Sequence, residues 1–347
     1  MKVIGFEEHY KLPAISAEHH RAGPNPTTDL LQAAGFGTPD GQGDWPPGIY
    51  ELGAGRIAAM DDAGIDVQIL SHSVPGPETL EPTVAAALAG QANDAVAAAV
   101  AQYPDRLRGF ATLPMRDPVA AATELERSVR QHGFVGALIN GHVNGRYLDD
   151  TFFWPVFEMA ENLGVPIYLH PVLPPQPVID ACYGGLNPRV SARLAAAGAG
   201  WHIDTGIHCL RLILGGVFDR FPALQVIVGH HFEALGWLGW RAEYAFGVAE
   251  TGLKRTVAAY LRENFYGGIL AGDFFTQEPG AVDPTWRLSL AAYQAMVSVV
   301  GIDRIVFTAD FPYGNAQASR RFLDQMPISE DDRAKIAHRN AERLLRL

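Results

Sequence analysis

Three residues able to bind a metal or transfer a proton lie close together near the start of the chain, directly after a short apolar run. They are Glu7, Glu8 and His9. If this segment is a strand, side chains alternate between its faces, so Glu7 and His9 point one way and Glu8 the other. A carboxylate and an imidazole on one face of a strand end are ligands that divalent cations use. A polar N-terminus would account for the same residues, so the prediction depends on residues elsewhere.

Polar residues also end several later apolar runs that read as strands. The residues in these positions are Ser71 and His72, Asn140, His170, His230 and Asp310. A single histidine at such a place is more often packed or solvated than functional. Several strands that end this way make a shared site the better interpretation, because the carboxyl ends of parallel strands meet at one end of a barrel.

The residue types at these strand ends suit metal-assisted chemistry. We expect one divalent ion, Zn²⁺ or Mn²⁺, bound by nitrogen and oxygen atoms of Glu7, His9, His170 and Asp310. His230 is then a candidate proton-transfer group, and Glu233 could orient its ring. His231 adjoins His230 and should point elsewhere, and its role and that of His72 stay open.

The rest of the chain reads as alternating strands and helices that would position these residues. Eight short apolar strands alternate with helices up to a last helix at 333–346, without a break in composition. Such alternation is typical of parallel βα units. Eight units favour a distorted (β/α)8 barrel of the TIM type over a doubly wound sheet, and no glycine-rich phosphate fingerprint follows the first strand. We expect a single barrel domain over residues 1–347.

Three segments interrupt this alternation. Residues 12–49, 173–206 and 269–290 have their own compositions, with many Gly, Pro and aromatic residues. Segments this long without a regular pattern are usually functional loops. We therefore expect three loop insertions that form the walls of a pocket.

The composition excludes several classes of protein. The chain is 48% hydrophobic and 19% charged, which is typical of a packed globular core, and its net charge of −11 comes with no basic run. The two cysteines, Cys182 and Cys209, are too few for a disulfide framework and fit a reducing compartment. The longest apolar runs are too short and too rich in alanine to span a bilayer. We expect a cytoplasmic protein without a nucleic-acid or membrane partner.

Five motifs, spread over nearly the whole chain, resemble those of the aromatic acid decarboxylases of the amidohydrolase superfamily, the group with γ-resorcylate and 2,3-dihydroxybenzoate decarboxylases. They occur in the family's order at Glu7–Pro13, Pro166–Pro171, Gly229–Glu233, Thr308–Pro312 and Asn340–Leu344. The chain opens with Glu-x-His, whereas hydrolytic members usually open with His-x-His, so the motif favours the decarboxylase branch.

The resemblance implies an amidohydrolase-type barrel with the ligand set given above and a relay of His230 and Glu233 with Asp310. It also implies that Arg241 lies near the substrate, although a surface arginine beside Trp240 is an equal alternative. Asn140, at the end of the fourth strand, is a further candidate substrate-binding residue. The expected partner is a small aromatic carboxylic acid, and the expected assembly is a homodimer or homotetramer.

The leading hypothesis is therefore metal-dependent, non-oxidative decarboxylation of a hydroxybenzoate-type acid, in which protonation of the carboxyl-bearing carbon precedes loss of CO₂. Asp310 is the expected proton donor. A metal-dependent hydrolase of a lactone or amide could use the same ligands, with water as nucleophile and Asp310 as base. A decarboxylase of a methoxylated or non-aromatic acid and a non-catalytic binding module are the remaining alternatives.

Overall fold

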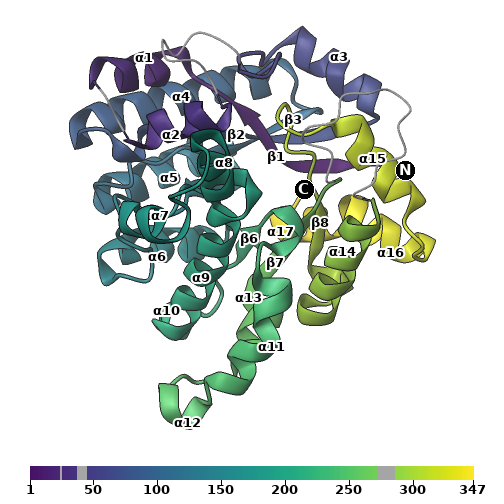
Figure 1. The fold of residues 1–347 in the computed structure, drawn as a ribbon. Coiled ribbons are helices and arrows are strands. Elements are labelled where there is room, and N and C mark those ends of the chain that lie inside the picture. The colour runs from purple at the N-terminus through teal and green to yellow at the C-terminus, as the bar shows by residue number, and fades with distance from the viewer. Residues whose placement is uncertain (24–25, 37–44, 272–285) are drawn as a thin grey trace.

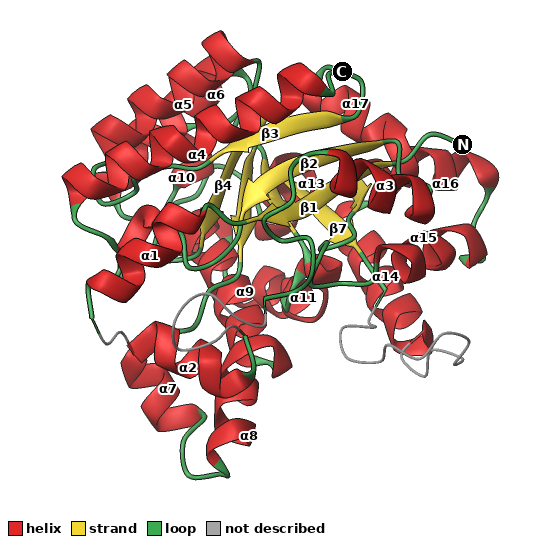
Figure 2. Cartoon of the chain, turned by 90° about the horizontal axis from the view of Figure 1, so that it is seen from above, coloured by secondary structure: helices red, strands yellow, loops and turns green. Residues whose placement is uncertain are grey.

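Eight parallel strands form the centre of the molecule. The computed structural model describes residues 1–23, 26–36, 45–271 and 286–347. The strands follow one another around a single sheet in chain order, and the bridge between Phe6 and Thr308 joins the first strand to the segment after the last. Figure 2 shows the strands inside a ring of helices. The strands are β1 (Ile4–Tyr10), β2 (Val67–His72), β3 (Leu107–Ala111), β4 (Gly136–Asn140), β5 (Ile167–His170), β6 (Val226–Val228), β7 (Phe265–Ile269) and β8 (Ile305–Phe307).

This arrangement confirms the predicted (β/α)8 barrel, and the helices surround it as expected. For example, the Asp117 side chain accepts hydrogen bonds at the start of α5, and Gly133, at a φ of 68°, ends that helix. The helices around the barrel are α3 (Ala54–Ala63), α4 (Pro82–Gln102), α5 (Pro118–His132), α6 (Trp154–Leu163), α9 (Gly200–Leu214), α10 (Val217–Arg220), α11 (Leu235–Ala245), α12 (Val248–Thr251), α13 (Val257–Asn264), α14 (Trp286–Val300), α15 (Ala316–Gln325), α16 (Glu330–Ala334) and α17 (Asn340–Leu345). The helices α11 and α12 project away from the barrel (Figure 1).

The expectation of long loops is wrong for two of the three segments. Residues 12–49 contain α1 (Pro13–Arg21) and α2 (Pro26–Ala34), and residues 173–206 contain α7 (Gln176–Cys182), α8 (Pro188–Arg193) and the start of α9. Prolines suggested loops there, but a proline is compatible with the first turn of a helix, where its missing N–H has no partner to lose. In the third segment β7 includes Ile269 and α14 begins at 286, while 272–285 lie outside the described residues.

The helices α2 and α8 pack against each other and carry a small apolar cluster of their own. Leu31, Ala34, Ala192 and Trp201 belong to this cluster, which is separate from the barrel core. Figure 2 shows α2, α7 and α8 grouped together beside the barrel. The two expected loops are therefore a small helical layer rather than irregular chain.

The long helix α4 is, within the described ranges, the one helix whose length and hydropathy would allow a membrane span. Its sequence is rich in alanine, and Ala85, Ala89, Ala92 and Val96 are fully buried. The helix packs against β3 and α5. A core helix of a barrel meets the same criteria of length and composition, so this finding is weak support for a membrane segment.

Below the strand ends, a buried arginine connects the first two strands. Arg56 donates to Oε1 of Gln68 at 3.1 Å, and Gln68 donates to Glu8 at 2.7 Å. The second oxygen of Glu8 accepts the backbone N–H of Ala309 at 3.1 Å. Burial raises the pKa of Glu8, and the charge of Arg56 opposes that shift. Glu8 thus points away from the site, as predicted, and joins the first and last strands to α3.

Arg56→Met should destabilise the protein strongly, because it leaves the Glu8 carboxylate buried without its cation. The expected loss in the free energy of unfolding is about 3–5 kcal/mol, the usual cost of removing one partner of a buried pair, measured by urea denaturation. Arg339→Met is the matched control: Arg339 is half exposed in its 2.6 Å pair with Asp331, so its loss should cost about 0–1 kcal/mol. Equal losses in the two variants would contradict this role of Arg56.

Candidate metal centre and active site

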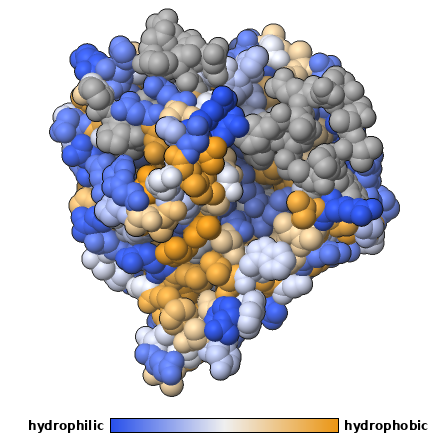
Figure 3. All heavy atoms as spheres, in the orientation of Figure 1, coloured by the Kyte–Doolittle hydropathy of each residue, from blue (hydrophilic) through white to orange (hydrophobic). Residues whose placement is uncertain are grey.

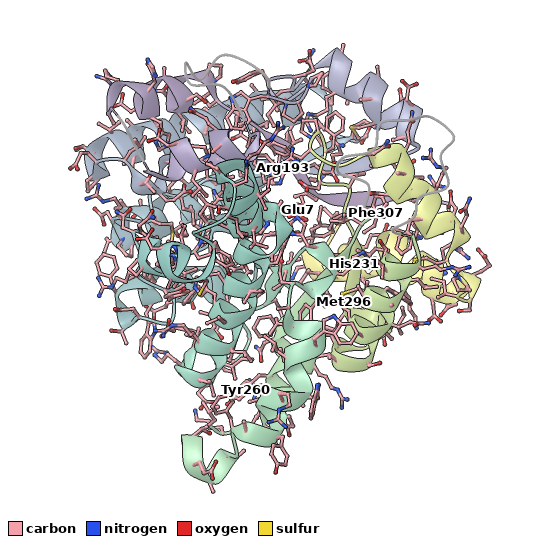
Figure 4. All side chains as sticks on the ribbon, viewed as in Figure 1. Glu7, Arg193, His231, Tyr260, Met296 and Phe307 are labelled. Atoms are coloured by element: carbon pink, nitrogen blue, oxygen red, sulfur yellow. The ribbon has the colours of Figure 1, made fainter. Side chains whose placement is uncertain are left out.

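The four predicted metal ligands converge at the carboxyl ends of the strands. Glu7 Oε1 lies 3.5 Å from His170 Nε2, and His9 Nε2 lies 3.2 Å from Asp310 Oδ1. The rings of His9 and His170 meet edge to face, with centroids 4.9 Å apart. Figure 4 shows Glu7 in the interior of the barrel. Residues from β1, β5 and the segment after β8 thus form one cluster, as the sequence predicted.

Unusual backbone conformations place several of these side chains. Glu7, His230, Glu233 and Asp310 all have a positive φ, at 62°, 46°, 51° and 51°. Such values are uncommon for residues with a side chain, and they concentrate at functional sites, where the surrounding structure holds the strain. The pairing of β1 with β2 also shifts register between Gly5 and Glu8. Glu7 and His9 therefore reach the same cluster, as alternation predicts, although the pairing of β1 with β2 is irregular at Glu7.

The cluster fits a single divalent cation. Glu7 Oε1 is buried without a hydrogen bond, and His9 Nε2 is buried with Asp310 Oδ1 at 3.2 Å, so both atoms face the centre of the cluster, where a cation would bind. The second oxygen of Glu7 and the second ring nitrogen of His9 have protein partners: Tyr168 donates to Glu7 Oε2 at 2.6 Å, and Ser71 Oγ lies 3.3 Å from His9 Nδ1. Such outer hydrogen bonds orient metal ligands. Gly229 is required here, because a Cβ would lie 2.4 Å from both Glu7 Oε2 and the Tyr168 hydroxyl.

Metal binding should depend on pH through Glu7. Burial raises the pKa of Glu7 to about 8, so at neutral pH its carboxyl carries a proton that a cation must displace. We expect Mn²⁺ affinity to increase as the pH rises toward 8, with proton release on binding, measured by calorimetry in buffers of different ionisation enthalpy. In Glu7→Gln, which cannot ionise, the proton release should be smaller. An affinity that does not change with pH would contradict the protonated state of Glu7.

The predicted proton relay is assembled as well. His230 Nδ1 lies 2.8 Å from Glu233 Oε1, and His230 Nε2 lies 3.5 Å from Asp310 Oδ2. Burial lowers the pKa of His230, but Glu7, Glu233 and Asp310 outweigh it and raise that pKa well above its usual value. Burial raises the pKa of Asp310, yet the hydrogen bonds and charges of His230 and His9 hold it well below the usual range. Both shifts favour a proton on His230 over one on Asp310.

A cavity opens beside this cluster and encloses about 610 Å³, including its mouth. One side is formed by His170, His230 and Asp310, and the rest of the lining is mostly apolar and aromatic. The remaining lining residues are Leu31, Phe36, Trp45, Ser73, Val74, Ala197, Trp201, His202 and Tyr313. Several come from the segments expected to form the pocket walls, so that part of the prediction is confirmed even though helices replace the loops.

Sequence reasoning missed three polar residues of the site. Tyr168 faces inward two residues before His170 on β5, and this spacing could have revealed it. Tyr313 lies on the segment after Asp310, and its hydroxyl is 2.8 Å from Ser73 Oγ. His202 lies in a segment interpreted as loop, and no strand pattern precedes it, so the sequence held no signal for it.

Other named residues lie outside the cavity lining. Arg241 is exposed on α11, where its guanidinium stacks over Trp240, so it does not line the cavity of its own chain. Asn140 is buried beside His170 in the sheet. Its side chain hydrogen-bonds the Glu78 carboxyl and lowers the pKa of Glu78, whereas burial raises that pKa.

Three further histidines make packing or hydrogen-bond contacts outside the metal cluster. The ring of His231 packs edge to face on Phe322, so it points away from the site as expected, and burial lowers its pKa to about 4. His72 accepts the backbone N–H of Leu12 at 3.0 Å. His19 is buried, and its Nε2 lies 2.8 Å from the carbonyl oxygen of Gly76.

Fold and cluster together define a (β/α)8 barrel with a site able to hold one metal ion among residues at the ends of the first, fifth and eighth strands. The family model described as "Amidohydrolase" matches residues 15–347, and the chain belongs to this family. It is 36% identical over 332 residues to a gamma-resorcylate decarboxylase of Polaromonas sp. strain JS666, an alignment that covers 92% of this chain and 94% of the relative.

Solved structures of similar proteins agree with this assignment. A 5-carboxyvanillate decarboxylase from Sphingomonas paucimobilis superposes with a TM-score of 0.85 at 30% identity, covering 100% of this chain and 99% of that one. A dihydroxybenzoic acid decarboxylase from Polaromonas sp. JS666, with bound manganese and the inhibitor 2-nitroresorcinol, superposes with a TM-score of 0.80 at 32% identity, covering 100% and 97%.

Proposed function

We propose that this protein catalyses metal-dependent, non-oxidative decarboxylation of a hydroxybenzoate-type acid. The observation that carries the proposal is the convergence of a Glu-x-His metal cluster with the His230–Glu233 pair beside an aromatic cavity. Relatives that cover nearly the whole chain are named as gamma-resorcylate decarboxylases, and one solved neighbour contains manganese with a resorcinol inhibitor. These similarities support the same reaction class here, with one Mn²⁺ or Zn²⁺ ion.

Glu7, His9, His170 and Asp310 would hold the cation, which would offset the negative charge of the acid and orient it. The carboxyl-bearing ring carbon must gain a proton before CO₂ leaves, because direct loss would create an unstable aryl anion. His230 carries the proton, and its Nε2 faces Asp310 Oδ2 at 3.5 Å. Asp310 can pass that proton to the ring carbon, and His230 regains one from solvent after each turnover. The aromatic lining stacks on the ring and excludes water.

The hydrolase alternative uses the same ligands, and the discriminating measurement is simple. We expect the manganese-reconstituted protein to release CO₂ from at least one ortho-hydroxybenzoate in a panel that varies the ring substituents, and a chelated sample to release none. A panel of lactones and amides is tested in parallel. Hydrolysis of a lactone without CO₂ release from any acid, with metal content verified, would overturn the proposal.

We also propose a homodimer or homotetramer in the cytoplasm, with a small aromatic acid as its ligand and no nucleic-acid or membrane partner. Trp237, Trp240 and Tyr244 on α11 are 66%, 64% and 80% exposed, and Arg241 stacks over two of these rings. Figure 3 shows apolar surface continuing toward this projecting helix. Exposed aromatic surfaces of this kind mark contact sites. Light scattering after gel filtration should show an oligomer, which Trp240→Glu should weaken; a monomeric wild type would contradict this.

A further inference from the structure

His202 has no role in the mechanism above, although its ring lines the cavity. His202 Nδ1 lies 2.5 Å from Glu233 Oε2, and the other oxygen of Glu233 lies 2.8 Å from His230 Nδ1. The centroids of the two imidazole rings are 4.9 Å apart. A carboxylate is therefore held between two imidazoles, one of which faces Asp310.

The Nδ1 atom of His202 donates to Glu233. An ionised carboxylate can only accept, so the Nδ1 atom that lies 2.5 Å from Glu233 Oε2 carries the proton of this contact. His202 Nε2 lies 2.9 Å from the indole Nε1 of Trp201 and 3.1 Å from the carbonyl oxygen of Ala197. These two contacts anchor the ring on its other side.

Glu233 depends on both imidazoles. Its side chain is fully buried, and each of its oxygens has one ring N–H as partner. Burial raises the pKa of Glu233, but His202 and His230 together outweigh burial and lower it, which keeps the carboxylate ionised. Without His202, one carboxylate oxygen would be buried and unpaired, which is costly. The carboxylate could then turn away from His230.

The atoms of His202, His230 and Glu233 are also close enough to suggest a second cation, since they lie within 4.8 Å of one another. Both Nδ1 atoms and both carboxylate oxygens are already joined by short hydrogen bonds, which argues against this interpretation.

We propose that His202 is a positioning residue of the active site: through Glu233 it fixes the ring of His230 against Asp310. The catalytic unit is then a His202–Glu233–His230 arrangement instead of a His–Glu pair. The proposal rests on the proposed decarboxylation, in which His230 supplies the proton.

The test compares His202→Ala, His202→Asn and His338→Asn in the manganese-reconstituted enzyme. We expect His202→Ala to lower kcat about 10- to 100-fold, the usual effect of losing a group that orients a catalytic residue, with KM and metal content little changed. An asparagine amide can replace Nδ1–H as donor, so His202→Asn should recover most of kcat. His338 is the matched control, because its Nδ1 lies 3.0 Å from Glu342 on the surface of another helix, and its variant should match the wild type.

A readout independent of catalysis separates this proposal from the decarboxylase assignment. In NMR spectra of the zinc-reconstituted wild type and variants, in which the bound ion is diamagnetic, the His230 Nδ1 proton that bonds Glu233 should shift in His202→Ala and return in His202→Asn. That result would hold even if no acid released CO₂, and then only the decarboxylase proposal would fail. Any one of four results would overturn the positioning role. The first two are a His230 proton that does not shift in His202→Ala, and a kcat of His202→Asn no better than that of His202→Ala. The other two are a kcat loss that parallels metal loss, and a second bound metal ion in the wild type that His202→Ala lacks.

Discussion

Asp310→Asn should abolish turnover while leaving the fold intact. Asp310 lies between His9 of the metal cluster and His230 of the relay, 3.2 Å from His9 Nε2 and 3.5 Å from His230 Nε2. An amide cannot accept the proton of His230 and deliver it, so kcat should fall about 10²- to 10⁴-fold, the usual contribution of a positioned acid or base. The measurement is CO₂ release from the best acid of the panel.

Two controls make this result interpretable. Metal content and the unfolding midpoint of Asp310→Asn should be recorded, because an asparagine oxygen can still contact a cation. Asp324→Asn, which removes the partner of an ion pair with Arg320 on α15, should retain wild-type activity. Near-normal turnover in Asp310→Asn would remove Asp310 from the mechanism and leave His230 as the direct donor.

His170→Ala should remove the metal and, with it, the activity. His170 is the proposed ligand from β5, and its ring packs edge to face on that of His9. In the wild type, Mn²⁺ at about 100 times its dissociation constant should add about 2.7 kcal/mol of stability through binding to the folded state. In His170→Ala this gain should disappear. Metal analysis and thermal unfolding with and without Mn²⁺ measure both effects.

His20→Ala is a suitable control for this experiment, because His20 is exposed on α1, away from the metal cluster. It should bind the metal and gain stability as the wild type does. Full metal occupancy in His170→Ala would contradict the assignment of His170 as a ligand. Activity that survives complete chelation of the wild type would contradict metal dependence itself.

The sequence predicted the barrel and its metal cluster because both depend on local patterns. Short apolar strands that end in Glu7, His170 and Asp310 indicate a shared site, since parallel strands bring their ends together wherever the intervening helices lie. The irregular strand pairing and the positive φ at Glu7 leave no such pattern. The Glu7 side chain also packs closely against Tyr168 and Gly229, and these are tertiary contacts.

The pocket walls were predicted less well for a different physical reason. Prolines in these segments suggested loops, whereas Pro13 and Pro188 begin helices whose stability comes from packing rather than from a periodic pattern. His202 was missed for the same reason, since its role depends on a contact with Glu233 across elements. Arg241 was assigned to the substrate site by resemblance. It lies exposed on α11, at the outer surface, and does not line the cavity of its own chain.

The apolar cluster that α2 shares with α8 has a consequence for how substrate choice could change. Leu31 and Trp201 belong both to this cluster and to the cavity lining, while the barrel core is a different set of residues. Substitutions at Leu31 can therefore change the wall without disturbing the strands that hold the acid–base groups, whereas Trp201 also contacts His202 at 2.9 Å. Recognition of the ring and the chemistry at its carboxyl group can thus diversify independently at Leu31, while a change at Trp201 would affect both.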